Sequence, residues 1–157
     1  MARFALVSNW HLAAPIDSVW DALYGVEHWP EWWPYVKKVE SIEPGDADGV
    51  GALRRYTWGS RLPYQLTFEM RVTRLEKPRT IEGDAVGELC GQGRWTLSPV
   101  GDTTRVRYDW AVSTTRPWMN RLAPLLAPAF RWNHNQVMAA GARGLARHLG
   151  VRLLSAQ

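Results

Sequence analysis

The order of apolar and polar residues predicts a strand, two short helices, six more strands and a long C-terminal helix. Between residues 4 and 12 the apolar side chains fall on one face of an expected strand, and they are Phe4, Leu6, Trp10 and Leu12. Pro15 and Asp17 are typical of a first helical turn, and Gly25 ends that helix. A second short helix or turn follows, which Pro30 and Pro34 keep from extending.

Six later segments have the alternation or composition of strands, and they span residues 36–42, 52–58, 65–74, 80–86, 93–97 and 104–112. The clearest is 65–74, where Leu66, Phe68, Met70 and Val72 alternate with polar residues. The turn sequence at 99–102 joins the last two strands as a hairpin. Short connections of this kind predict an antiparallel sheet with one covered face and one wet face.

The C-terminal part is predicted to be helical, because apolar or small residues, together with one histidine, recur there at three- and four-residue spacing. They are Phe130, His134, Val137, Met138, Gly141, Leu145 and Leu149. Pro124 and Pro128 predict a kinked or broken segment from Trp118 to Pro128, followed by a continuous helix to about His148. The fold class is therefore α+β, with the long helix covering the sheet. The length predicts a single domain over residues 1–157.

Composition narrows the classes of partner. The net charge is +4, but the arginines are scattered and no basic run exceeds two residues, so nucleic-acid binding is not expected. Cys90 is the only cysteine, which fits a reducing compartment. No signal-peptide core or membrane-length apolar run occurs, so the expected location is cytoplasmic. Ten tryptophans indicate broad aromatic surfaces inside the protein or around a site.

Several stretches resemble the Bet v 1/START-like superfamily, in particular bacterial SRPBCC proteins of the polyketide cyclase type. They lie at residues 14–23, 28–34, 44–51, 62–64, 91–95 and 132–138, so the resemblance covers nearly the whole chain. It implies a helix-grip fold, in which a seven-stranded curved antiparallel sheet wraps around the last helix and encloses a cavity. Members bind lipids, sterols, hormones or polyketides, and a minority catalyse cyclisation, dehydration or hydrolysis. Because a fold does not set a function, no catalytic residue is carried over.

We expect the cavity to hold a small hydrophobic molecule, flat or polycyclic, because the strand residues predicted to face inward are unusually aromatic. The alternative is ordinary packing, since aromatic side chains also dominate filled cores. Ligand pockets commonly measure roughly 300–1,000 Å³. The predicted ligand-binding residues are Trp10, Tyr56, Trp58, Phe68, Met70, Trp95, Tyr108, Trp110, Phe130, His134 and Met138.

His134 is the sharpest single candidate, since it lies one helical turn from Phe130 and one from Met138 on the apolar face. A buried histidine without a partner costs roughly 1–3 kcal/mol. Three roles stay open: a structural histidine bonded to Tyr108 or Glu88, a contact to the ligand, or an acid–base residue acting with Tyr108.

Other polar and aromatic residues near the expected cavity have two interpretations each. Arg54 is expected to pair with a glutamate such as Glu69 or Glu88 or to face water, or else to pair with a ligand carboxylate. Asn133 and Asn135 are expected to cap the helix or face solvent. Four tryptophans outside the strands are expected to line the cavity mouth as a gate or to pack in the core, with dimer or membrane contact as a further alternative. They are Trp29, Trp32, Trp33 and Trp118.

Several common chemistries lack their sequence signature. The glycine-rich turn at 45–51 lacks the ending of a phosphate-binding loop, and the glycines at 87–93 do not precede a helix. No histidine pair has zinc spacing and no serine elbow occurs, so neither a metal nor a cofactor is expected.

Three hypotheses for the function remain: a binding protein for a hydrophobic molecule, which is favoured; a polyketide cyclase, aromatase or dehydratase using His134; and a Trp-rich lipid- or protein-interaction module. Catalysis and homodimer formation stay open.

Overall fold

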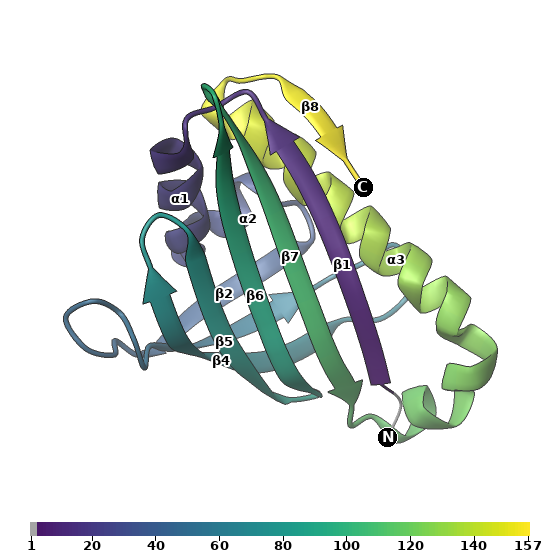
Figure 1. The fold of residues 1–157 in the computed structure, drawn as a ribbon. Coiled ribbons are helices and arrows are strands. Elements are labelled where there is room, and N and C mark those ends of the chain that lie inside the picture. The colour runs from purple at the N-terminus through teal and green to yellow at the C-terminus, as the bar shows by residue number, and fades with distance from the viewer. Residues whose placement is uncertain (1–2) are drawn as a thin grey trace.

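The computed structural model describes residues 3–157, which form one curved antiparallel sheet closed on its concave side by a long helix (Figure 1). The sheet has eight strands in the order β2-β3-β4-β5-β6-β7-β1-β8. The elements are β1 (Arg3–Leu12), α1 (Ile16–Tyr24), the 3-10 turn η1 (Val26–His28), α2 (Trp29–Trp32), β2 (Val36–Glu43), β3 (Leu53–Trp58), β4 (Leu66–Glu76), β5 (Thr80–Gly87), β6 (Leu89–Val100), β7 (Thr103–Thr114), α3 (Pro117–Leu149) and β8 (Leu153–Ala156).

All seven expected strands are present, and the helix-grip arrangement is confirmed. Strands β2 to β7 follow one another as an antiparallel meander, and β1 pairs with β7 along its whole length. The hairpin predicted at 99–102 joins β6 to β7, where Gly101 has a φ of 59°. Only a residue that tolerates this left-handed conformation suits so tight a turn.

The strand count of seven is wrong, because β8 adds an eighth strand at the edge beside β1. Gly150 has a φ of 66° and donates its N–H to the carbonyls of Ala146 and Arg147, which ends α3 and reverses the chain. The next residues then pair with β1, with Trp10 opposite Ala156. Four residues without apolar alternation gave no local signal for this strand.

Helix α3 continues through both of its internal prolines, so the alternative of a broken segment at 118–128 is wrong. Pro124 and Pro128 lie inside the helix as the structure assigns it. The axis of α3 changes direction near its N-terminal end, which is the kink expected where proline removes backbone hydrogen bonds (Figure 1). Among residues 3–157, no helix combines the length and hydropathy needed to cross a bilayer.

Two glycines of α3 let the short helix α2 pack directly on it. A Cβ on Gly144 would lie 1.7 Å from the carbonyl oxygen of Trp32, and one on Gly141 would lie 2.3 Å from the Trp33 ring. The Trp33 indole donates a hydrogen bond to the Val137 carbonyl of α3 at 2.9 Å. This close approach places α2 against one end of the concave face and therefore limits the space beneath α3.

Candidate functional site

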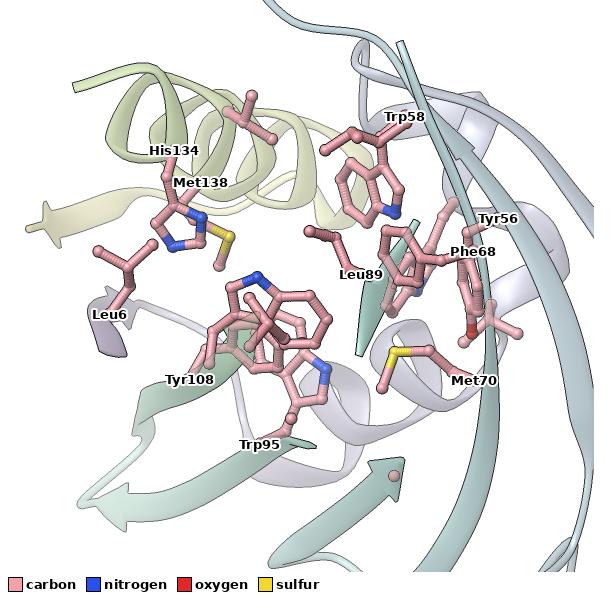
Figure 2. Close-up of a pocket in the computed structure, with 18 of the residues that line it drawn as sticks. Leu6, Tyr56, Trp58, Phe68, Met70, Leu89, Trp95, Tyr108, His134 and Met138 are labelled. Atoms are coloured by element: carbon pink, nitrogen blue, oxygen red, sulfur yellow. The ribbon is translucent and has the colours of Figure 1, made fainter. Parts of the chain in front are cut away.

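A cavity of about 190 Å³ lies between the concave face of the sheet and α3 (Figure 2). It lies where two apolar clusters of the core meet, because Trp58, Met70 and Tyr108 pack against both clusters. Ten of the eleven predicted ligand-binding residues line it, and they are Tyr56, Trp58, Phe68, Met70, Trp95, Tyr108, Trp110, Phe130, His134 and Met138. The structure therefore brings this set together, and their contact with a ligand stays a prediction.

Trp10 is the exception among the predicted residues, because it does not line the cavity. Its side chain is 2% exposed, and its ring lies 5.6 Å from that of Trp33 and 5.3 Å from that of Trp95. Phe4 and Leu6, on the same strand, do line the cavity. The inward face of β1 was thus predicted correctly, but at Trp10 that face is already covered by Trp33.

The cavity is smaller than the roughly 300–1,000 Å³ of common ligand pockets, because tryptophans of the α2 segment fill one end of the concave face. Trp29, Trp32 and Trp33 are 5%, 6% and 1% exposed. All three therefore pack in the core, as in the second of the two expectations, and two of them, Trp29 and Trp33, also form part of the buried cavity wall. Trp118 is different, since it is 40% exposed and packs its ring 5.8 Å from that of Tyr64.

His134 reaches the cavity from α3, and its Nε2 atom is buried without a hydrogen-bond partner (Figure 2). Glu88, one of the two partners expected for it, instead accepts hydrogen bonds from the Arg116 guanidinium at 2.6 Å and from the Thr67 N–H at 2.5 Å. The expectation of a structural histidine satisfied by Tyr108 or Glu88 is therefore wrong. Burial lowers the pKa of His134 from 6.5 to about 4, so the imidazole is neutral near pH 7.

The depressed pKa of His134 makes the stability depend on pH. Between about 4 and 6.5 the unfolded chain binds a proton at this site that the folded chain does not. We expect the free energy of unfolding to fall by up to about 3 kcal/mol as the pH is lowered across this window. Above pH 6.5, His134 should make no contribution to the change of stability with pH. Urea unfolding of the wild type and of His134→Leu at a series of pH values measures this. If the free energy of unfolding changed with pH to the same extent in the two proteins, the prediction would be contradicted.

The other polar side chains at the cavity are un-ionised or paired. Burial raises the pKa of both Tyr56 and Tyr108, so neither hydroxyl ionises near neutral pH. Arg54 lines the cavity and its Nε lies 3.3 Å from Oε1 of Glu27. Pairing of Arg54 with Glu69 or Glu88 was thus wrong, because Arg54 points to the concave face, where η1 supplies its partner. No group of three or more potential metal-ligating side chains occurs in the described part of the chain.

Asn133 joins α3 to the loop between β3 and β4, which sequence reasoning missed. Its side chain is 5% exposed; Oδ1 accepts a hydrogen bond from the Arg61 N–H at 3.1 Å, and Nδ2 donates to the Tyr64 hydroxyl at 3.2 Å. Asn133 and Tyr64 both line the cavity. The amide therefore fastens this loop over one side of the cavity. Asn135 is exposed, as expected.

We expect Asn133→Ala to loosen the loop at residues 59–65. The substitution leaves the Arg61 N–H and the Tyr64 hydroxyl without their partner, so the free energy of unfolding should fall by about 1–3 kcal/mol. Amide hydrogen exchange across the loop should accelerate while exchange in β6 and β7 stays unchanged. Asn135→Ala is the matched control on the exposed side. Equal exchange in both variants would contradict the role of Asn133.

Comparison with known proteins agrees with this architecture. The family described as "Polyketide cyclase / dehydrase and lipid transport" matches residues 3–150. The chain belongs to this family. Its description covers both enzymes and lipid-handling proteins, so membership indicates a fold that binds small hydrophobic molecules or cyclises polyketides, and it does not choose between them. No curated protein matches the chain.

Solved structures show the same fold at low sequence identity. A START superfamily protein from Mycobacterium smegmatis has a TM-score of 0.76 and 16% identity, and the match covers 93% of this chain and 97% of that one. A protein from Thermus thermophilus has a TM-score of 0.75 and 15% identity, with 92% and 99% covered. The Zhui aromatase/cyclase from a Streptomyces species has a TM-score of 0.69 and 17% identity, with 94% and 96% covered.

Proposed function

We propose that this protein binds a small, uncharged aromatic molecule of one or two rings in the cavity beneath α3. The observation that carries the proposal is the aromatic lining, which comes from five strands and from the helices, and whose charged side chains are all paired. An apolar protein cavity of about 150 Å³ accepts benzene. A cavity of about 190 Å³ therefore suits a molecule modestly larger than benzene rather than a long chain or a large polycycle.

The cost of an empty cavity also favours a ligand. Leu→Ala substitutions in protein cores lose about 24 cal/mol per Å³ of residual cavity. At about 190 Å³, the corresponding cost is about 4–5 kcal/mol. This is a large share of the stability of an ordinary domain, which is about 5–15 kcal/mol. A flat apolar ligand would recover this loss by restoring contacts along the cavity walls.

Binding is favoured over cyclisation because the cavity lacks a convincing acid–base pair. His134 lines the cavity in the neutral form that a base needs, but its pKa of about 4 makes it a weak base near pH 7, and a second group with a matched pKa is also needed. Tyr108, the expected second member, is buried and its pKa is raised, so it remains a phenol. A catalytic His134 would require His134→Ala to lower turnover of a polyketide-like substrate more than tenfold.

The interaction-module hypothesis loses most of its basis. It relied on four tryptophans at the cavity mouth, and three of them are packed in the core, which leaves Trp118 as the exposed member. We therefore do not propose a lipid-surface or protein-binding role for this cluster.

Titration of the purified protein with ethylbenzene and naphthalene tests the proposed function. Several tryptophan rings border the cavity, so saturable one-to-one binding should change the intrinsic fluorescence. Bound ligand should also stabilise the fold, by about 2.7 kcal/mol when its free concentration is a hundred times Kd. Absence of saturation with both compounds, together with an unchanged Tm, would refute the proposal.

A further inference from the structure

Two polar atoms on the cavity wall have no partner within the protein. Nε1 of Trp58, on β3, and Nε2 of His134, on α3, are both shielded from solvent and make no hydrogen bond. Both residues line the cavity, and Figure 2 shows them on different sides of it. Buried polar groups in folded proteins are almost always satisfied, so each exception calls for a specific cause. Two exceptions bordering one cavity indicate groups that a ligand satisfies.

Two other polar side chains at the cavity, Asn133 and Arg54, are satisfied within the protein. The Asn133 amide is bonded at both ends, to Arg61 and Tyr64, and the guanidinium of Arg54 is paired with Glu27. One further buried side-chain atom in the described residues lacks a partner, Nε1 of Trp32, but Trp32 does not line the cavity. Two of the three fully buried side-chain atoms without a partner in the described residues therefore border this cavity.

The chemistry of these two atoms defines the groups that complement them. An indole N–H only donates, so Trp58 requires an acceptor such as a carbonyl oxygen. The neutral imidazole of His134 donates or accepts at Nε2 according to its tautomer, and a hydroxyl group satisfies either state. An ionised group would enter a cavity that offers it no free counter-charge, which is strongly unfavourable.

We propose that the ligand is a neutral ring molecule with a carbonyl-type acceptor bound by Trp58 and a separate hydroxyl bound by His134. This inference rests on the proposed function, because it assigns the polar groups of the molecule that the same cavity holds. Aromatic walls set the shape of the ligand, and the two nitrogen atoms set its orientation.

A set of single-ring probes separates the contributions of the carbonyl and the hydroxyl group to the affinity. Ethylbenzene carries neither oxygen function, acetophenone carries the carbonyl, ethylphenol carries the hydroxyl, and hydroxyacetophenone carries both. The meta and para isomers are measured so that the spacing of the two groups is covered. Each oxygen function should lower Kd by about 3- to 10-fold, and the better hydroxyacetophenone isomer should bind about 10- to 100-fold more tightly than ethylbenzene. Acetylbenzoate, which is charged, should bind at least tenfold more weakly than acetophenone.

Two variants show which nitrogen atom, Nε1 of Trp58 or Nε2 of His134, is responsible for each increase in affinity. Trp58→Phe keeps an aromatic ring but removes the donor, so the gain from the carbonyl should vanish while ethylbenzene still binds. His134→Leu should remove the gain from the hydroxyl and leave that from the carbonyl. In NMR spectra, the indole proton of Trp58, identified by its loss in Trp58→Phe, should move downfield with acetophenone and not with ethylbenzene.

The outcomes distinguish this inference from the function on which it rests. If ethylbenzene saturates the cavity but neither hydroxyacetophenone isomer binds more tightly, the inference is overturned and the proposed function stands. Gains that persist in Trp58→Phe and His134→Leu also overturn it, as does acetylbenzoate binding as tightly as acetophenone. If no probe binds at all, the proposed function itself fails and the inference fails with it.

Discussion

Gly144→Ala is expected to lower the free energy of unfolding by about 3 kcal/mol or more, although the same change at an exposed helical position is stabilising by about 1 kcal/mol. The reversal of sign arises from the contact between α2 and α3. A Cβ at residue 144 would lie 1.7 Å from the Trp32 carbonyl oxygen, which belongs to the backbone and cannot rotate away. The two helices must therefore separate, and Trp33 would lose its hydrogen bond to the Val137 carbonyl.

Urea unfolding measures this effect, and Arg143→Ala is the control. Arg143 is the adjacent exposed residue of α3, so its replacement tests helix propensity without the clash and should change stability by less than about 0.5 kcal/mol. Gly141→Ala should also destabilise, but by less, because the nearest atoms are those of the Trp33 side chain rather than backbone. A Gly144→Ala protein as stable as the wild type would mean that α2 does not pack on α3 as described.

Leu89→Trp is expected to weaken binding of ethylbenzene and naphthalene by at least about 30-fold, because the larger side chain would occupy the cavity. Leu89 begins β6, is 7% exposed and projects into the cavity, as Figure 2 shows. The fold should survive, since the added atoms fill space that is otherwise empty and costly. Ligand titration followed by intrinsic fluorescence gives the affinity, and thermal unfolding without ligand gives the stability.

Val86→Trp provides the surface control for this experiment. Val86 lies on β5, is 52% exposed and does not line the cavity, so the same added bulk should leave affinity unchanged. If Leu89→Trp does not fold, Leu89→Phe introduces a smaller obstruction with a proportionally smaller loss of affinity. Unaltered affinity in a folded Leu89→Trp protein would place the ligand elsewhere.

The local pattern of apolar and polar residues was sufficient to predict most strands of the sheet and most residues of the cavity wall. Along a strand, alternate side chains point to the same face, so the inward set follows from the sequence once each strand is located. For this reason Phe68, Tyr108 and Trp110 could be assigned to the concave face without coordinates, and they line the cavity. The same argument placed His134 and Met138 on the covered face of α3, where helical spacing repeats over many turns.

Features that depend on two distant segments could not be predicted in this way. Asn133 and Asn135 are both polar residues of one helix, and only the position of the β3–β4 loop makes the first a buried link and the second exposed. Arg54 found its partner in η1 rather than on the next strand because the concave face brings Glu27 near it. Neither the burial of Asn133 nor the partner of Arg54 can be predicted from the spacing of nearby residues in the sequence.

The sequence by itself determined the α+β class, seven of the eight strands, the covering helix and ten of the eleven expected residues around the cavity. These features follow from periodicity, which acts over a few neighbouring residues. Tertiary structure alone decided that Trp33 closes one end of the concave face, that β8 pairs with β1, and that the cavity measures about 190 Å³. It also decided which buried nitrogens remain unpaired, because whether a polar atom is satisfied depends on every segment that surrounds it.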